Sequence, residues 1–104
     1  MIPNELCGLS DITQKQLILL FKKFPKIKKV ILYGSRAKGN FKTGSDIDLT
    51  VDAPDMTLSE LLEIENNIDD LLLPYKIDLS LIHHIDNPAL LDHIERMGKV
   101  FYGK

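Results

Sequence analysis

The sequence predicts a small α/β protein of the α+β type, a mixed β-sheet with flanking helices. Three short apolar segments, at residues 29–33, 46–51 and 76–81, have the length and alternation of β-strands. Two longer segments, at residues 10–24 and 58–73, repeat their apolar residues with helical spacing, and so does a third after Asn87. The predicted order is therefore roughly α-β-β-α-β-α, which is typical of a small sheet covered by helices.

Length and composition indicate a single domain spanning residues 1–104. With 104 residues, of which 44% are hydrophobic and 27% charged, the chain is an ordinary globular sequence that can form one core. Its net charge of −2 argues against a nucleic acid as direct substrate, although it leaves a local basic patch open. The single Cys7 excludes an internal disulfide. We find no signal peptide and no apolar run of about 18 residues, so we expect a cytoplasmic protein without membrane contact.

The first predicted helix, at residues 10–24, has candidate caps in Ser10, Asp11 and Thr13, and Pro25 is expected to end it. Its inward positions are expected to be Ile12, Leu17, Leu20, Phe21 and Phe24. Residues 1–9 are expected to form a loosely held lead-in.

A basic cluster covers the end of this helix and the following turn. It consists of Lys22, Lys23, Lys26, Lys28 and Lys29. Cations suit the C-terminal end of a helix, so a solvated helix end is one interpretation. A patch that attracts nucleotide phosphates, RNA or an acidic partner is the other.

Carboxylates alternate with apolar residues in the segment at 46–51. Successive side chains of a strand point to opposite faces, so Asp46, Asp48 and Thr50 share one face of the predicted strand. Neighbouring negative charges repel unless a cation lies between them. Mg²⁺ is commonly bound by one or two carboxylates together with substrate phosphates, so this face is a candidate magnesium site. The alternative is that the charges only protect a strand edge from aggregation.

The helix predicted at 58–73, which precedes the strand at 76–81, is indicated by its cap, its end and its apolar stripe. Thr57 or Ser59 is the expected cap, with Glu60 in the first turn and Pro74 after the end. The inward stripe is expected to be Leu58, Leu61, Leu62, Ile64, Ile68, Leu71 and Leu72. The acids expected on the solvated face are Glu63, Glu65, Asp69 and Asp70.

Asp78 repeats the pattern of the preceding strand. It shares one face of the segment at 76–81 with Ser80, while the apolar residues share the other. Asp78 is therefore a third candidate carboxylate, and an ordinary exposed acid is the alternative.

The last predicted helix begins with an Asn87 cap and Pro88 in its first turn, and Gly98 is placed to end it. Its inward positions are expected to be Leu90, Leu91, Ile94 and Met97, followed by a short closing strand at 100–102. His93 lies between acidic neighbours and is expected on the surface, and His83 and His84 are expected in a loop.

A turn follows the first strand at Gly34–Ser35. Glycine removes the Cβ that would obstruct an anion, and consecutive N–H groups of such a turn can bind phosphate. Ser35 adds a hydroxyl, and Arg36 and Lys38 add positive charge suited to triphosphate oxygens. The segment lacks the Lys-Ser/Thr of a Walker A loop and the spacing of a dinucleotide fingerprint. Tyr33 is expected to pack in the core.

The combination of these motifs resembles a known family. Gly34-Ser35, a gap of ten residues and Asp46-Ile47-Asp48 are similar to the signature of the nucleotidyltransferase superfamily related to DNA polymerase β. The frame GSRAKG…GSDIDL resembles in particular the minimal nucleotidyltransferases, domains of about this size. The resemblance implies the nucleotidyltransferase fold over nearly the whole chain. Lys38 stands where an arginine is frequent, which implies a looser grip on phosphate.

The resemblance also implies roles for individual residues. Gly34 and Ser35 would bind the nucleotide phosphates, and Asp46, Asp48 and Asp78 would be catalytic carboxylates and ligands of two Mg²⁺ ions. Two metals clamp the attacking and leaving oxygens of an in-line displacement at phosphorus. ATP would be the substrate.

The partner and acceptor are likewise implied. Minimal nucleotidyltransferases are commonly the antitoxin of a pair with a helical HEPN-domain toxin, in which AMP is transferred from ATP to a tyrosine hydroxyl of the toxin. We therefore expect a hetero-oligomer with such a partner. One alternative is a binding module that neutralises its partner by contact alone, and another is a nucleotidyltransferase for a small molecule.

Overall fold

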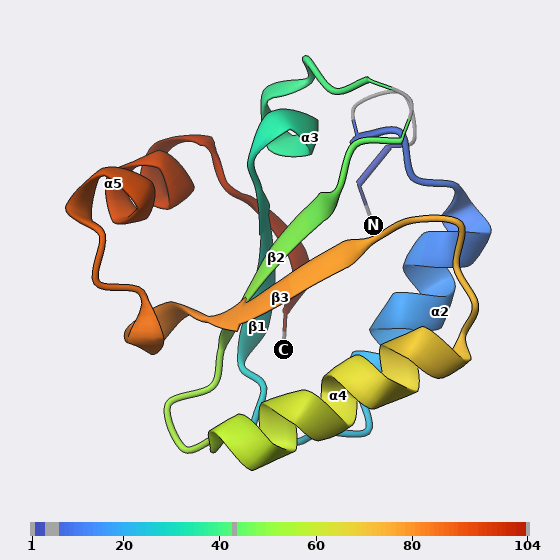
Figure 1. Ribbon diagram of the computed structural model, residues 1–104, viewed down its shortest axis with the longest axis vertical. Helices are drawn as coiled ribbons and strands as arrows, with labels where there is room; N and C mark the ends of the chain where they lie inside the picture. The colour runs from blue at the N-terminus through green and yellow to red at the C-terminus, as the bar shows by residue number, and fades with distance from the viewer. Residues whose placement is uncertain (1, 4–6, 43, 104) are drawn as a thin grey trace.

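The computed structural model describes residues 2–3, 7–42 and 44–103 (Figure 1). The elements of this part of the chain are α2 (Asp11–Phe21), β1 (Lys29–Tyr33), α3 (Ser35–Lys38), β2 (Ile47–Asp52), α4 (Leu58–Asp70), β3 (Ile77–Leu81), the 3₁₀ turn η1 (Ile82–His84), α5 (Pro88–Met97) and β4 (Lys99–Gly103). The predicted order of helices and strands is confirmed, closing strand included. The short α3 and η1 were not predicted. None of the helices in these ranges has the length and apolar character needed to cross a membrane.

The four strands form one sheet in the order β3-β2-β1-β4. β1 runs antiparallel to β2 and β4, whereas β2 and β3 are parallel. Parallel neighbours need a crossover connection, and α4 provides it between β2 and β3. The sheet is therefore mixed, as predicted, and β3 is one of its free edges (Figure 1).

The two faces of the sheet have different environments. α2 and α4 lie against one face and α5 lies on the other (Figure 1). The strand residues buried under α2 and α4 are Val30, Leu32, Ile47, Leu49, Val51, Leu79 and Leu81. Because side chains alternate along a strand, Asp48, Thr50, Asp78 and Ser80 all belong to the face of α5.

Helix caps are as predicted in three places. Ser10 accepts a hydrogen bond from the Thr13 N–H at the start of α2, and Asn87 caps α5 with Pro88 in its first turn. At the start of α4, the Thr57 hydroxyl and the Glu60 carboxylate each accept from the other residue's backbone N–H, at 3.2 and 3.1 Å. α2 and α4 end at Phe21 and Asp70, before Pro25 and Pro74 and earlier than the bounds predicted from these prolines.

Residues 2–3 and 7–9 do not form the expected loose lead-in, and the rest of that prediction lies outside the described residues. Cys7 and Leu9 are fully buried, and Ile2 is 7% exposed. Gln14 of α2 is buried with them, and its amide accepts from Ile2 N at 2.8 Å and donates to the carbonyls of Ile2 and Leu9. The described lead-in is therefore part of the core, tied down by one buried polar side chain.

Several apolar residues that were expected to face inward are exposed instead. They are Ile12, Leu58, Leu62, Leu72 and Met97, with exposed fractions of 71%, 59%, 56%, 88% and 41%. Leu72 lies beyond the end of α4 with a φ of +53°, so it no longer follows the helical spacing, and the other four lie beside the buried positions of their helices. The stripes were therefore predicted too wide.

The basic cluster lies far from the Gly34–Ser35 turn. Lys29 begins β1 and Tyr33 ends it, so the cluster and the turn are at opposite ends of a strand that is about 13–16 Å long. Lys26 binds Glu60 of α4 at 2.9 Å, which holds the carboxyl pKa of Glu60 below its ordinary value. This arrangement disfavours a role of the cluster in binding nucleotide phosphates at the turn, whereas a patch for RNA or an acidic partner stays a prediction.

Candidate functional site

A row of three side chains crosses the face of the sheet that α5 covers. The register pairs Tyr33 of β1 with Asp48 of β2, and Asp48 with Asp78 of β3. Paired residues of neighbouring strands point to the same face, so the two carboxylates lie side by side. Asp46, the residue before Ile47, is exposed and close enough for its charge to act on Asp48. The three predicted carboxylates therefore lie at one end of the sheet.

The surroundings of Asp48 disfavour its charged form. Its carboxyl is half-buried, and burial is the largest cause that raises its pKa above the ordinary value. The negative charges of Asp78 and Asp46 raise this pKa further, and His93 acts in the opposite direction. A site that gathers repelling carboxylates favours a bound cation.

The donor chemistry of this end of the sheet fits Mg²⁺. Within residues 2–3, 7–42 and 44–103, no group of three or more His, Cys, Asp and Glu side chains is arranged to hold a metal ion. Mg²⁺ needs only one or two protein carboxylates when phosphate oxygens complete its shell. The residues present therefore fit an ion that binds together with a triphosphate.

Gly34 lies against the carboxylate of Asp48. Its φ is +78°, a conformation that favours glycine, and a Cβ at this position would collide with Asp48 Oδ2. Glycine is therefore needed here for two reasons: the turn requires a positive φ, and the carboxylate of Asp48 leaves no space for a side chain. Ser35 follows as the first residue of α3 and is half-buried.

Arg36 and Lys38 lie on different sides of α3. Each residue of a helix is rotated by about 100° from the last, so residues two apart point in nearly opposite directions. Lys38 is exposed, whereas Arg36 is only 2% exposed. Of the two predicted phosphate ligands, Lys38 is therefore the one whose side chain is open to solvent.

The Arg36 guanidinium has partners inside the protein. It donates to the carbonyl of Cys7 at 2.9 Å and to that of Ser45 at 2.8 and 3.2 Å. It also lies over the rings of Phe41 and Tyr75, 5.1 and 5.2 Å from their centroids. Arg36 therefore joins the segment before α2 to the loop before β2, an arrangement that disfavours the predicted role in binding phosphate.

His93 of α5 reaches the turn, contrary to the prediction that it lies on the surface. Its Nε2 accepts a hydrogen bond from the Gly34 N–H at 2.9 Å, and its ring makes an edge contact with Tyr33, with centroids 6.3 Å apart. A signal for this was present, because His93 follows the half-buried Leu90 by three residues and lies next to the buried Ile94. Its acidic neighbours in the sequence obscured that spacing.

Tyr33 is buried, as predicted, and its hydroxyl lies on the polar face. Burial raises the hydroxyl pKa, as do the charges of Asp48 and Asp78, whereas a hydrogen bond with Ser80 lowers it. Ser80 also donates to the Thr50 hydroxyl at 3.1 Å. Thr50 and Ser80 thus form a second polar pair on the same face, two residues further along the strands than Asp48 and Asp78.

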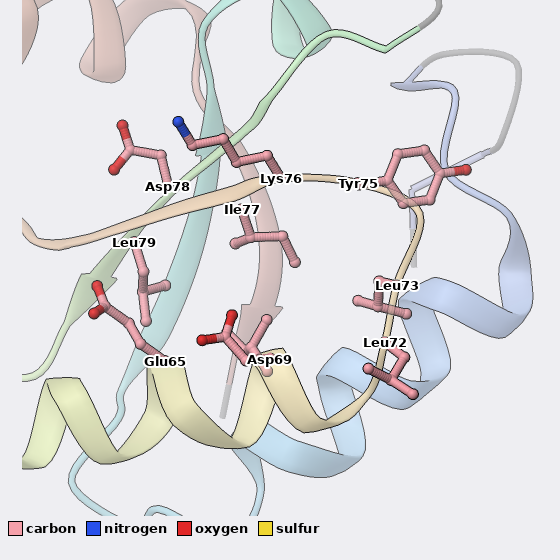
Figure 2. A pocket seen from close by; sticks show the side chains of 10 residues that line it. Glu65, Asp69, Leu72, Leu73, Tyr75, Lys76, Ile77, Asp78 and Leu79 are labelled. Carbon is pink, nitrogen blue, oxygen red and sulfur yellow. The ribbon is translucent and has the colours of Figure 1, made fainter.

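A hollow of about 440 Å³ runs along the free edge of β3, between this strand and α4. Figure 2 shows Asp78 and Lys76 pointing to one side of β3, and Ile77 and Leu79 to the other. The hollow therefore begins beside the carboxylates, and α4 contributes the acids Glu65 and Asp69 together with Ile68 to its lining.

Comparison with known proteins identifies clear relatives. The family model described as "Polymerase beta, Nucleotidyltransferase" matches residues 15–104. Two proteins of Methanocaldococcus jannaschii that are classed as protein adenylyltransferases are 35% and 34% identical, each over 86% of this chain and 91% of the relative.

Solved structures share the fold. A toxin–antitoxin structure with AMP-PNP superposes with a TM-score of 0.70 at 25% identity, over 88% of this chain and 73% of that one. A structure of a tri-AMPylated Shewanella oneidensis HEPN toxin in complex with an MNT antitoxin gives a TM-score of 0.67 at 21% identity, over 92% of this chain and 74% of that one.

Proposed function

This chain belongs to the polymerase β family of nucleotidyltransferases, and we propose that it is an Mg²⁺-dependent adenylyltransferase that moves AMP from ATP to a hydroxyl. The observation that carries this proposal is the register that aligns Asp48 with Asp78 next to the Gly34–Ser35 turn. The names of the curated relatives support adenylyl transfer as the reaction.

Each residue of the site has a part in this proposal. Asp46, Asp48 and Asp78 would hold Mg²⁺, which supplies charge stabilisation at the phosphate oxygens when it is bound. Gly34 leaves space beside Asp48, and the Ser35 hydroxyl and the Lys38 ammonium bind the triphosphate. Two ions per site are expected from the family's chemistry.

The reaction is an in-line displacement at the α-phosphorus of ATP. The acceptor oxygen forms a bond to this phosphorus while the bond to the bridging oxygen of the leaving pyrophosphate breaks. The proton of the acceptor hydroxyl passes to a carboxylate, and Asp78 is the candidate base because it is exposed at the edge of the sheet, where an acceptor can approach.

The acceptor that we propose is a tyrosine hydroxyl of a helical HEPN-domain toxin, so that the chain acts as an antitoxin in a complex with its target. Two of the fold neighbours are toxin–antitoxin structures, one with AMP-PNP and one with a tri-AMPylated HEPN toxin. These neighbours support both the nucleotide and the partner.

The test uses the purified chain, ATP labelled in its α-phosphate, Mg²⁺ and the protein encoded by the neighbouring gene. We expect label to appear covalently on a tyrosine of the partner, and to be lost with EDTA. Absence of label from an active preparation that binds ATP would overturn the proposal.

A second candidate is neutralisation of the partner by contact alone. It is favoured by one observation, that one of the fold neighbours is a complex of a HEPN toxin with an MNT antitoxin. The double variant Asp46→Asn, Asp48→Asn separates the two functions, because neutralisation by contact survives the loss of the carboxylates and neutralisation by AMP transfer does not.

A further inference from the structure

We propose that His93 is a positioning residue of the nucleotide site, which holds the Gly34–Ser35 turn in the conformation that binds the triphosphate. This inference rests on the proposed function, because it concerns how the chain binds ATP. It assigns a task to α5, which otherwise contributes no residue to the proposed chemistry.

The first step is the hydrogen bond itself. The Gly34 N–H donates to His93 Nε2 at 2.9 Å, so the imidazole carries its proton on Nδ1 in this contact. This N–H is one of the donors that a phosphate-binding turn would otherwise direct at an anion. Because the Gly34 N–H is bonded to His93, the Ser35 amide and hydroxyl are the donors of the turn that bind the triphosphate, together with the Lys38 ammonium.

The second step is that the peptide plane of Gly34 has little room to rotate. Gly34 has a φ of +78° and lies in contact with Asp48. A small rotation of its peptide plane would therefore displace Ser35 on one side or crowd Asp48 on the other. A hydrogen bond from a helix fixes this plane better than one from a mobile loop side chain.

The third step is the rigidity of the support. α5 begins at the Asn87 cap, which accepts from the N–H groups of Ala89 and Leu90 at 3.0 and 3.2 Å. It ends at Met97, and the N–H of the following Gly98 donates to the Ile94 carbonyl at 2.9 Å. Ile94, next to His93, is 4% exposed and anchors the helix on the sheet.

The experiment compares nucleotide binding in His93→Phe and His93→Gln with the unchanged chain. Phenylalanine keeps a ring beside Tyr33 but has no acceptor, whereas glutamine places an amide oxygen within reach of the Gly34 N–H. We expect His93→Phe to weaken AMP-PNP binding about three- to tenfold, the range for one lost hydrogen bond. We expect His93→Gln to recover most of it, with unchanged thermal midpoints in both variants.

Steady-state kinetics and NMR add two readouts that simple packing would not move. KM for ATP should rise in His93→Phe with a smaller change in kcat, because the turn positions the nucleotide before reaction. In the nucleotide-free chain, the imidazole nitrogen signals should show a proton on Nδ1, and the Gly34 amide signal should shift in His93→Phe.

The outcomes separate this inference from the proposed function. Equal AMP-PNP affinity in all three proteins overturns the role of His93, and so does an equal loss in His93→Phe and His93→Gln with lowered thermal midpoints. Binding of AMP-PNP without AMP transfer overturns the proposed function alone. Failure of the unchanged chain to bind AMP-PNP overturns both.

Discussion

The two faces of the sheet differ in what they do for the protein. On the face covered by α2 and α4, the strands present side chains such as Leu49 and Leu81 that are almost completely buried. On the face of α5, the same strands present Asp48 and Asp78, whose charges repel each other. Period-two alternation thus lets one strand contribute to the core with every second residue and to the site with the others.

The difference shows where stability and activity can be separated. Neighbouring residues of β2 face opposite ways, so substitutions one position apart test the two faces without changing the strand. The four predictions below separate stability from activity in this way, from the largest expected effect to the smallest.

The largest effect is expected for Asp48→Asn. The amide keeps the shape of the side chain but removes the charge that would hold Mg²⁺, so AMP transfer should fall about a thousandfold, measured with labelled ATP and partner. The matched control is Asp52→Asn at the far end of β2, opposite Lys29, which should keep nearly full activity. Loss of activity in both variants would mean that the site is not confined to one end of the strand.

The next effect is expected for Leu49→Ala, one residue further along β2. Leu49 is fully buried, so the substitution should lower the free energy of unfolding by about 2–5 kcal/mol. Urea denaturation measures this loss. Leu62→Ala is the control, since Leu62 is 56% exposed and should cost much less. A large loss at Leu62 as well would show that this surface is packed in solution.

Much of the architecture could be predicted because its signals are local. β1 has the predicted bounds, since a basic turn precedes it and Gly34 follows it directly. The capping box of Thr57 and Glu60, and the Asn87-Pro88 start of α5, are sequence patterns that need no distant partner. Alternation alone placed Asp48 and Asp78 on the polar side of their strands.

What could not be predicted depends on partners far away in the chain. His93 is 59 residues from Gly34, and nothing in its neighbourhood reveals which strand end α5 covers. Arg36 looks like a phosphate ligand until its carbonyl partners, Cys7 and Ser45, are known. A polar residue such as Gln14 is expected to be exposed, although Gln14 is fully buried and accepts a hydrogen bond from the Ile2 N–H.

The contrast between Arg36 and Lys38 gives a third, smaller effect. Arg36→Leu leaves the carbonyls of Cys7 and Ser45 without their charged donor, so it should cost about 2 kcal/mol of unfolding free energy. Lys38→Ala, in the same four-residue helix, should leave stability unchanged and raise KM for ATP about tenfold. If Lys38→Ala destabilised the protein and Arg36→Leu changed only KM, the assignment of the two residues would be reversed.

The smallest effect is the pH dependence of stability at Asp48. Burial and the charges of Asp78 and Asp46 raise the Asp48 pKa above its value in the unfolded chain, so the folded state binds this proton more tightly. The folded state is then favoured by a protonated Asp48 and loses stability as pH rises from the ordinary aspartate range, about 3.9, through the raised pKa. Without Mg²⁺, Asp48→Asn should therefore have a higher thermal midpoint than the unchanged chain at pH 7.

This gain should disappear at low pH, where both side chains are uncharged. Thermal midpoints of the two proteins in EDTA, measured from pH 3 to pH 7 by calorimetry, test the sign. A lower midpoint for Asp48→Asn at pH 7 would show that the carboxylate stabilises the metal-free fold, which contradicts the repulsion between the acids. Because Mg²⁺ offsets this repulsion, adding it should raise the midpoint of the unchanged chain and have little effect on the variant.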